Sequence, residues 1–204
     1  MHTDFEVVLP LRVSPQPSPG IISGGDCGAC VLAGLFGVSV EVAYDEYIEE
    51  RRELAEGTLC SAISKAESEG LVDRCLLASP FWIERIHSPL SAFGVLGVRM
   101  ALQYSHYVLM ALDANYYGIC TVREGRLDEK SEQRGDTNHW VLICGYRERW
   151  IDLGKGVRRC DQEILISCSA TNPDGYWIGV RKFLATKGGF MIKTVRVTAK
   201  NGVL

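Results

Sequence analysis

Apolar residues are spaced differently in the two halves of the chain. In the first half they recur at helical spacing, and residues 27–36 are apolar on nearly all sides, which predicts a buried helix. Asp26 stands where it could cap this helix, and Gly37 stands where the helix would end. Residues 89–103 also have helical spacing, although glycines interrupt them.

Capping residues mark the expected bounds of two further helices in the first half. Residues 39–57 alternate apolar and charged positions as an amphipathic helix does, and they begin at Ser39. Residues 58–71 form a second amphipathic segment, which Thr58 would cap and Gly70 would stop. The first half is therefore expected to be helical.

The second half is rich in β-branched and aromatic residues, with turn residues between short apolar runs. It opens with a short apolar run at 106–114. The runs at 139–148, 163–170 and 190–199 predict strands. Residues 175–189 predict a short helix between the last two strands. This order favours an antiparallel sheet.

The two halves together predict an α+β protein, in which a helical half packs on a C-terminal antiparallel sheet. A chain of 204 residues is long enough for one domain with a core of ordinary size, so we expect a single domain over residues 1–204. Residues 1–22 are expected to form an extended arm with a proline-rich loop, since Ser14–Gly20 contains three prolines.

Composition narrows the classes of function. The formal net charge is only −3, so electrostatics gives no reason to expect nucleic acid or an anionic membrane as a partner. The N-terminal residues contain acids and too short an apolar core for a signal peptide, and no apolar run is long enough to span a bilayer. Eight cysteines spread over a chain of ordinary core composition predict reduced, mostly buried thiols and a cytoplasmic protein.

One of these cysteines stands in a setting that favours reactivity. Cys27 lies in the glycine-rich stretch SGGDCGAC, at the start of the predicted buried helix. Unpaired backbone N–H groups and the helix dipole at such a position stabilise a thiolate. The same N–H groups could hold an oxyanion. Cys27 is therefore a candidate nucleophile.

A nucleophilic thiol needs a base, which is usually histidine. His139 is the best candidate of the four histidines, because it opens a predicted central strand that would fix its ring. His2 lies in the terminal arm, and His87 and His106 lie near loops or segment edges. Trp140, next to the candidate base, is expected in the core.

The base in turn needs a side chain that orients its ring. The strand after that of His139 is followed by the polar stretch SATNPDG. Asn172 is the first choice, because an Asn-Pro pair is expected to close the strand into a fixed turn. Ser169 and Asp174 are the alternatives.

The stretches GDCGAC, NHWVLICGY and SATNPDG resemble the motifs of the C39-like branch of papain-fold cysteine peptidases. They are also similar to a related domain of the same fold that is called guanylyl-cyclase-like. Residues 58–71 and 98–114 are similar to the intervening helix and strand of that fold. The resemblance implies a papain-like fold in which Cys27 attacks a carbonyl, His139 is the base and Asn172 orients it.

Two departures from the family pattern bear on this prediction. The family usually has an oxyanion-donating glutamine six residues before the nucleophile, where this chain has Ile21. Gln16 and Ser23 are nearby, at other spacings. Residues 147–162 lengthen the hairpin after the histidine strand, so the register of Asn172 cannot be counted across it.

These observations predict a thiol-dependent hydrolase or acyltransferase, a cysteine peptidase or amidase in character, acting on a peptide or amide substrate through an acyl-enzyme. No cofactor is expected, because no phosphate-binding loop is present. A thiol–disulfide oxidoreductase using Cys27 and Cys30 is one alternative. An inactive papain-fold binding module is another. Zinc is disfavoured because the C-x-x-C pair has no second ligand pair nearby.

Overall fold

A computed structural model of the chain describes residues 4–17, 27–47, 56–74, 95–123, 138–185 and 190–198. Five helices and one antiparallel sheet of seven strands occupy these ranges, so the architecture is α+β as the sequence predicts. The helices are α1 Cys27–Phe36, α2 Val40–Tyr47, α3 Glu56–Ser68, α4 Val95–Asp113 and α5 Val180–Ala185.

All strand pairs in the sheet are antiparallel, and the strand order is β2-β7-β3-β4-β5-β6, with β1 paired to β4. The strands are β1 Phe5–Val8, β2 Val72–Arg74, β3 Tyr117–Arg123, β4 Asn138–Asp152, β5 Arg158–Cys168, β6 Asn172–Gly179 and β7 Phe190–Val197.

Two shorter strands share one edge of β4. The first half of β4 pairs with β3, and its second half pairs with β1. Between these two halves β4 carries a bulge, because Ile143 pairs with Ile166 whereas Gly145 pairs with Leu165. A side chain at Gly145 would place Cβ only 2.9 Å from Cβ of Leu165, so the close approach of the strands at this position favours glycine.

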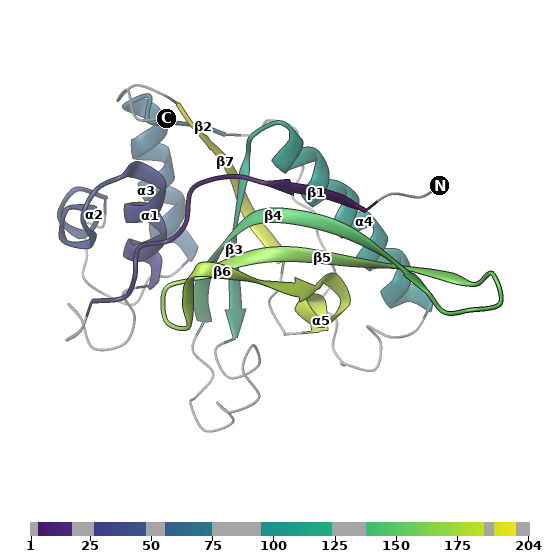
Figure 1. Ribbon diagram of the computed structural model, residues 1–204. Helices are drawn as coiled ribbons and strands as arrows, with labels where there is room; N and C mark the ends of the chain where they lie inside the picture. The colour runs from purple at the N-terminus through teal and green to yellow at the C-terminus, as the bar shows by residue number, and fades with distance from the viewer. Residues whose placement is uncertain are drawn as a thin grey trace.

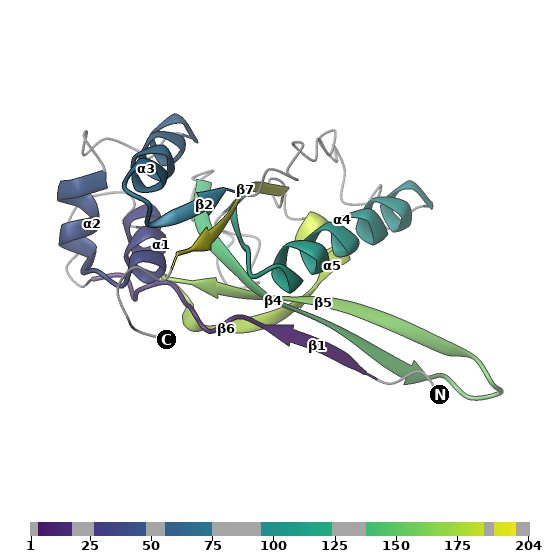
Figure 2. The same cartoon turned by 90° about the horizontal axis from the view of Figure 1, so that it is seen from above.

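The helices cover the sheet unevenly. Figures 1 and 2 show α1, α2 and α3 gathered at one end of the molecule, and α4 and α5 on one face of the sheet beside β4 and β5. Helix α1 packs against β4, while α4 packs against β4, β3 and β1. The strand that carries the candidate histidine is therefore central and covered.

Large apolar side chains from both halves form one continuous core. Trp140 and Tyr146 of β4 lie in this core together with residues of α1 and α4. Burying aromatic and aliphatic surface of this kind supplies most of the stabilisation of a domain of this size. Trp140 is fully enclosed, as the sequence predicts.

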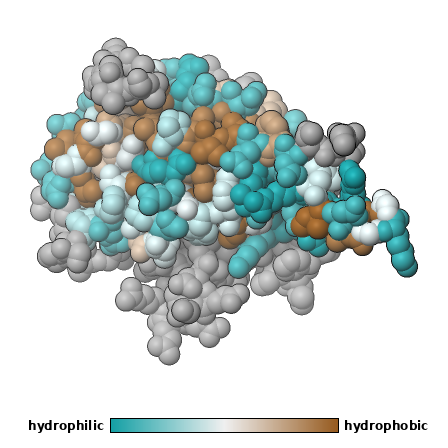
Figure 3. Space-filling view, in the orientation of Figure 1, coloured by the Kyte–Doolittle hydropathy of each residue, from teal (hydrophilic) through white to brown (hydrophobic). Residues whose placement is uncertain are grey.

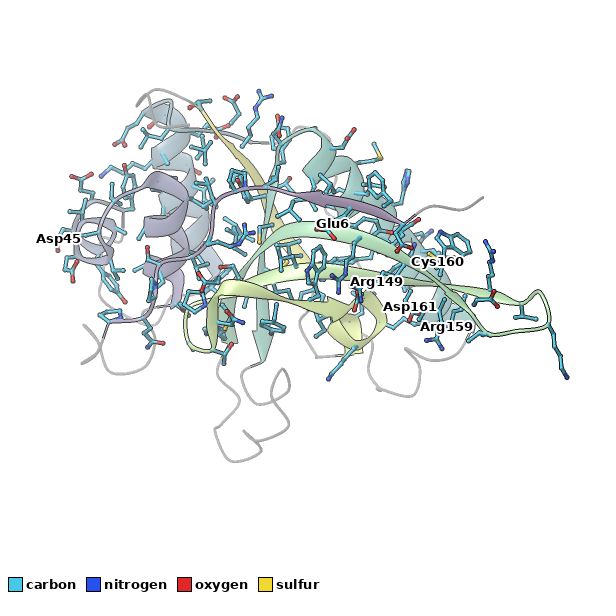
Figure 4. The ribbon with its side chains drawn as sticks, viewed as in Figure 1. Glu6, Asp45, Arg149, Arg159, Cys160 and Asp161 are labelled. Atoms are coloured by element: carbon cyan, nitrogen blue, oxygen red, sulfur yellow. The ribbon has the colours of Figure 1, made fainter. Side chains whose placement is uncertain are left out.

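The hairpin formed by β4 and β5 extends beyond the body of the molecule (Figures 1 and 2). Its tip exposes Ile151, Leu153 and Val157, and apolar atoms are visible along it in Figure 3. One side of the ribbon is charged: Arg149 pairs with Asp161 in register, and Asp161 also forms an ion pair with Arg159 (Figure 4). Residues 147–162 thus lie in a hairpin, as expected from the sequence.

Several predicted helix ends are confirmed. Helix α1 ends before Gly37 and α3 ends before Gly70, and both glycines have positive φ, of 67° and 71°. Ser39 precedes α2, and its hydroxyl accepts a hydrogen bond from the backbone N–H of Val42. Thr58 does not cap α3, because that helix already begins at Glu56.

Strands β2 and β3 were not predicted, and several other segments differ from the prediction. The apolar run at 106–114 was grouped with the sheet half and likened to a strand of the papain fold. It instead forms the second half of the 19-residue helix α4, because its apolar spacing continues that of the residues before it. The predicted helix at 175–189 is divided, since residues up to Gly179 belong to β6 and only α5 is helical. The arm at 1–22 contains β1, which pairs with β4.

No single helix in the described ranges is long and apolar enough to cross a membrane. Helices α1 and α2 taken together reach that length and composition, but they meet at an angle of 99°. The predicted cap Asp26 and residues 48–55 of the second predicted helix lie outside the described residues.

Candidate functional site

Cys27 is the first residue of α1, as predicted. The helix is buried on nearly all sides, and Cys27 itself retains 7% exposure. Because the first N–H groups of a helix have no partner within it, they direct partial positive charge toward this thiol. The position therefore suits a thiolate or an oxyanion.

His139 is the second residue of β4 and is 5% exposed. Its register partner on the neighbouring strand β3 is Val122. The ring makes a hydrogen bond with the Cys27 thiol, although more than a hundred positions separate the two residues in the sequence. The structure thus brings together the predicted nucleophile and the predicted base.

A second thiol, which the sequence analysis did not single out, contacts the same ring. Cys168 is the last residue of β5 and is 1% exposed. Its Sγ lies 3.0 Å from Nε2 of His139. His139 therefore stands between two cysteines that come from a helix and from a strand.

His139 and Cys168 have strongly shifted pKa values. Burial works to lower the pKa of His139, but its hydrogen bonds with the Cys168 and Cys27 thiols outweigh burial and raise the pKa to about 10. Burial works to raise the pKa of Cys168, but the hydrogen bond and charge of His139, with hydrogen bonds from Thr171, lower it to about 7. The pair therefore favours a thiolate beside an imidazolium.

An N-terminal strap, residues 9–16, connects the two elements that carry these thiols. The backbone N–H of Ser14 donates to the carbonyl of Cys30 on α1, at 3.0 Å. Two residues further, the backbone N–H of Gln16 donates to the carbonyl of Ser169 at the end of β5, at 3.2 Å. The strap therefore fixes α1 relative to the end of β5, and with it the position of Cys27.

Close packing holds the strap against α1. A side chain at Gly34 would place Cβ 2.0 Å from the carbonyl oxygen of Arg12, so only glycine allows the strap to lie this near the helix. On the other side, the backbone N–H of Val13 donates to the hydroxyl of Ser167 on β5, at 2.9 Å. Ser167 is fully buried, so this bond lies in the core.

The three candidate orienting residues occupy different places near the end of β5. Asn172 opens β6, opposite Cys168 in the register of the two strands, so the Asn-Pro pair lies in a strand and not in the turn that was expected. Ser169 is buried, and its hydroxyl has no hydrogen-bond partner among the described residues. The carbonyl of Asp174 accepts a hydrogen bond from Arg12. An orienting role for Asn172 stays a prediction.

The strap also places one candidate oxyanion donor. Gln16 is exposed, and its backbone bond to Ser169 holds it beside the end of β5, next to Cys168. Ile21, at the spacing typical of the resembled family, and Ser23 lie outside the described residues. Gln16 is thus the glutamine that the described strap holds beside the end of β5.

The other cysteines and histidines have different surroundings. Cys30 is fully buried, and its thiol donates to the carbonyl of Pro15 at 3.8 Å, a contact typical of packing. His106 is exposed on α4, and His2 and His87 lie outside the described residues. The six cysteines with described surroundings form no disulfide bond, and all except Cys160 are buried.

Thiols and imidazole are ligands that zinc prefers. Within the described ranges, however, no three His, Cys, Asp or Glu side chains are placed to hold a metal ion.

Comparison of this chain with protein-family models, with curated proteins and with solved structures finds no match.

Proposed function

We propose that this protein is a thiol-dependent hydrolase or acyltransferase that acts on a peptide or amide bond through Cys27 and His139. The observation that carries the proposal is the hydrogen bond between the Cys27 thiol and the His139 ring. A thiol at a helix N-terminus beside a histidine on a strand is the arrangement that activates cysteine nucleophiles.

The order of elements supports a papain-like version of this chemistry. A buried helix carries the nucleophile at its first residue and packs on the antiparallel strand that carries the base. The strap adds backbone hydrogen bonds to both elements, which limits movement of the thiol relative to the ring. Such rigidity is what positioning of reacting groups requires.

In the proposed reaction His139 takes the proton of the Cys27 thiol, and the thiolate attacks the substrate carbonyl carbon. Backbone N–H groups at the start of α1 stabilise the resulting oxyanion. The imidazolium then gives its proton to the leaving amine, the C–N bond breaks and a thioester remains on Cys27. Water, an amine or a thiol attacks the thioester while His139 takes the proton of the attacking group, and Cys27 is released.

Selective alkylation tests this proposal. A limiting amount of iodoacetamide should label Cys27 in preference to the other cysteines, as peptide mapping by mass spectrometry would show. His139→Ala should reduce the rate at Cys27 by roughly a hundredfold, the usual contribution of a general base. Equal and slow labelling of several cysteines, unaffected by His139→Ala, would support an inactive binding module instead.

A matched cysteine variant separates the proposal from thiol–disulfide exchange. Cys30→Ser removes the second thiol of the C-x-x-C pair but leaves the Cys27–His139 contact in place. The acyl-transfer proposal expects Cys27 to be labelled at nearly the original rate in this variant. A redox enzyme that uses both cysteines would lose its disulfide chemistry entirely.

A further inference from the structure

We propose that Cys168 is the positioning residue of the site: its thiolate accepts a hydrogen bond from Nε2 of His139 and holds the ring with Nδ1 toward Cys27. Sulfur would thus occupy the place where cysteine and serine enzymes commonly use an oxygen side chain. The part of the inference that concerns Nδ1 and Cys27 rests on the proposed function. The part that concerns Cys168 and Nε2 does not.

The sulfur of Cys168 is well placed to fix the ring. Cys168 follows directly after Ser167, which pairs with Leu142 of β4, and it pairs on its other side with Asn172 of β6. Strands on both sides therefore hold its backbone, while the side chain is 1% exposed. A contact of 3.0 Å from so constrained a sulfur leaves the ring little freedom to turn.

Hydrogen-bond donors surround this sulfur. Besides the ring of His139, both the hydroxyl and the backbone N–H of Thr171 form hydrogen bonds with Cys168. A neutral thiol is a weak acceptor, whereas a thiolate gains stability from every donor directed at it. Three donors around one buried sulfur indicate a place built for an anion, which agrees with the lowered pKa of Cys168.

The proton balance follows from this arrangement. Nε2 of the ring carries a proton and donates it to the Cys168 thiolate. Nδ1 holds the proton taken from the Cys27 thiol before substrate binds, so that an imidazolium stands between two sulfur anions, in agreement with the raised pKa of His139. Cys168 neither gains nor loses a proton during the cycle. Its charge stabilises the imidazolium, as an aspartate does in other triads.

Two titratable groups act on the ring within the described part of the chain. They are Cys27 from α1 and Cys168 from β5, while the facing residue of β3 is the apolar Val122. Changes in the titration of His139 can therefore be assigned by removing one thiol at a time.

The first test examines Cys168 without relying on the chemistry of Cys27. NMR of the His139 ring nitrogens is recorded against pH in Cys27→Ser protein and in the same protein with Cys168→Ser, a change of nearly equal size. The pKa of His139 should lie above its ordinary value of 6.5 in the first protein and fall toward it in the second. An unchanged titration would overturn the proposal, whatever the reaction that the protein catalyses.

The second test measures positioning of the base. In Cys168→Ser the alkylation rate of Cys27 should fall roughly tenfold or more, and its pH profile should shift. Cys168→Asp restores an anion and should recover most of the rate, a result that a purely structural role would not produce. Cys144→Ser, which changes another buried thiol of β4–β5, should leave both readouts unchanged.

Two outcomes would contradict the assignment. In the first, Asn172→Ala slows alkylation of Cys27 and removes the raised pKa of His139, while Cys168→Ser behaves as the original protein. This result would assign the positioning role to Asn172. Labelling of Cys168 in place of Cys27 would make Cys168 the nucleophile. A third result separates the two proposals. If the His139 titration changes as expected in Cys168→Ser but Cys27 is labelled slowly and without selectivity, the His139–Cys168 pair is upheld and only the proposed function is rejected.

Discussion

His139 and Cys168 meet at the ends of two neighbouring strands, with 3.0 Å between Nε2 of the ring and Sγ of the thiol. Both side chains are buried, so little water screens their interaction. Their pKa values consequently move apart from the ordinary values, to about 10 for the imidazolium and to about 7 for the thiol. This relationship gives the clearest measurable properties of the site.

The first prediction concerns the ionisation of Cys168. Its thiolate should appear with a midpoint near pH 7, because its pKa is lowered from 9.0 to about 7. In His139→Ala the charge and hydrogen bond of the ring are absent while burial still disfavours the anion, so the midpoint should move above 9.0. The ultraviolet absorbance of the thiolate, followed through a pH titration, measures both midpoints.

Cys144 supplies the control for this titration. It is also buried, but burial raises its pKa to about 11, so Cys144→Ser should not change the absorbance step near pH 7. A step that survives in Cys168→Ser, or one that is lost in Cys144→Ser, would show that a different cysteine titrates there.

The second prediction is a pH dependence of stability. The pKa of Cys168 is lower in the folded protein, so its contribution is complete above pH 9.0 and is lost as the pH falls through about 7. The pKa of His139 is higher in the folded protein, so its contribution is complete below pH 6.5 and is lost as the pH rises through about 10.

In the folded protein both groups are charged only between about pH 7 and about pH 10, so the ion pair should exist and stabilise the fold within this window. The difference in Tm between the original protein and Cys168→Ala should be largest inside this window and should shrink on either side of it. Thermal unfolding followed by circular dichroism measures the difference, and a difference that does not depend on pH would reject the ion pair.

The third prediction concerns Gln16 as an oxyanion donor. Gln16→Ala should lower the turnover of an acyl substrate by roughly a hundredfold, the usual effect of removing one such donor. It should leave alkylation of Cys27 unchanged, because alkylation by iodoacetamide forms no oxyanion. Parallel measurement of acyl turnover and alkylation distinguishes this role from a general disturbance of the site.

Glu6 provides the control for the Gln16 experiment. It is an exposed residue of the same N-terminal region, on β1 beside the outer part of β4 (Figure 4). Glu6→Ala should alter neither rate. If Gln16→Ala lowers alkylation as much as turnover, Gln16 supports the local structure and is not an oxyanion donor.

The fourth prediction concerns the contact between the strap and α1. Gly34→Ala would force Cβ against the carbonyl oxygen of Arg12, and neither backbone can move without disturbing the other. Overpacking of this kind typically costs about 1–3 kcal/mol in the free energy of unfolding. Displacement of α1 should also slow alkylation of Cys27. Chemical denaturation and alkylation kinetics measure the two effects.

Gly179 is the matched control, because a Cβ there would meet no atom within 4 Å. Gly179→Ala should leave both the unfolding free energy and the alkylation rate close to those of the original protein. Similar losses in the two variants would mean that the cost arises from changing any glycine and not from the contact with Arg12.

The fifth prediction concerns the buried hydroxyl of Ser167. It accepts a hydrogen bond from the N–H of Val13 and donates one to the carbonyl of Pro173. Ser167→Ala leaves both groups without this partner in the core, which should lower the free energy of unfolding by about 1–3 kcal/mol. Ser68→Ala removes an exposed hydroxyl that bonds to the carbonyl of Lys65, and it should cost much less.

Local patterns in the sequence were sufficient for many of the elements. The buried helix α1 and the cap at Ser39 depend on residues within a few positions of each other, as do the helix-ending glycines Gly37 and Gly70. The same holds for the strands around His139 and Cys168. Spacing and capping express local energies, so no knowledge of distant contacts is needed to predict them.

Elements whose conformation depends on distant partners were not predictable in this way. Strands β1 and β2 are short and gain their hydrogen bonds from β4 and β7, far away in the sequence. The apolar run in the second half of α4 is compatible with either a helix or a strand. It is helical because it continues the helical turns that begin at Val95. The start of β6 was predicted as turn and helix, but pairing with β5 overrides that local tendency.

The sequence alone was enough to select Cys27 and His139, because a thiol at a helix start and a histidine at a strand start are local features. Tertiary structure alone decided that Cys168, and not Ser169, contacts the ring. The bulge at Cys144 shifts the register of β4 on β5 by one residue, so the side chain that faces His139 changes from Ser169 to Cys168. A one-residue shift of this kind arises from the pairing of two strands, and neither strand encodes it by itself.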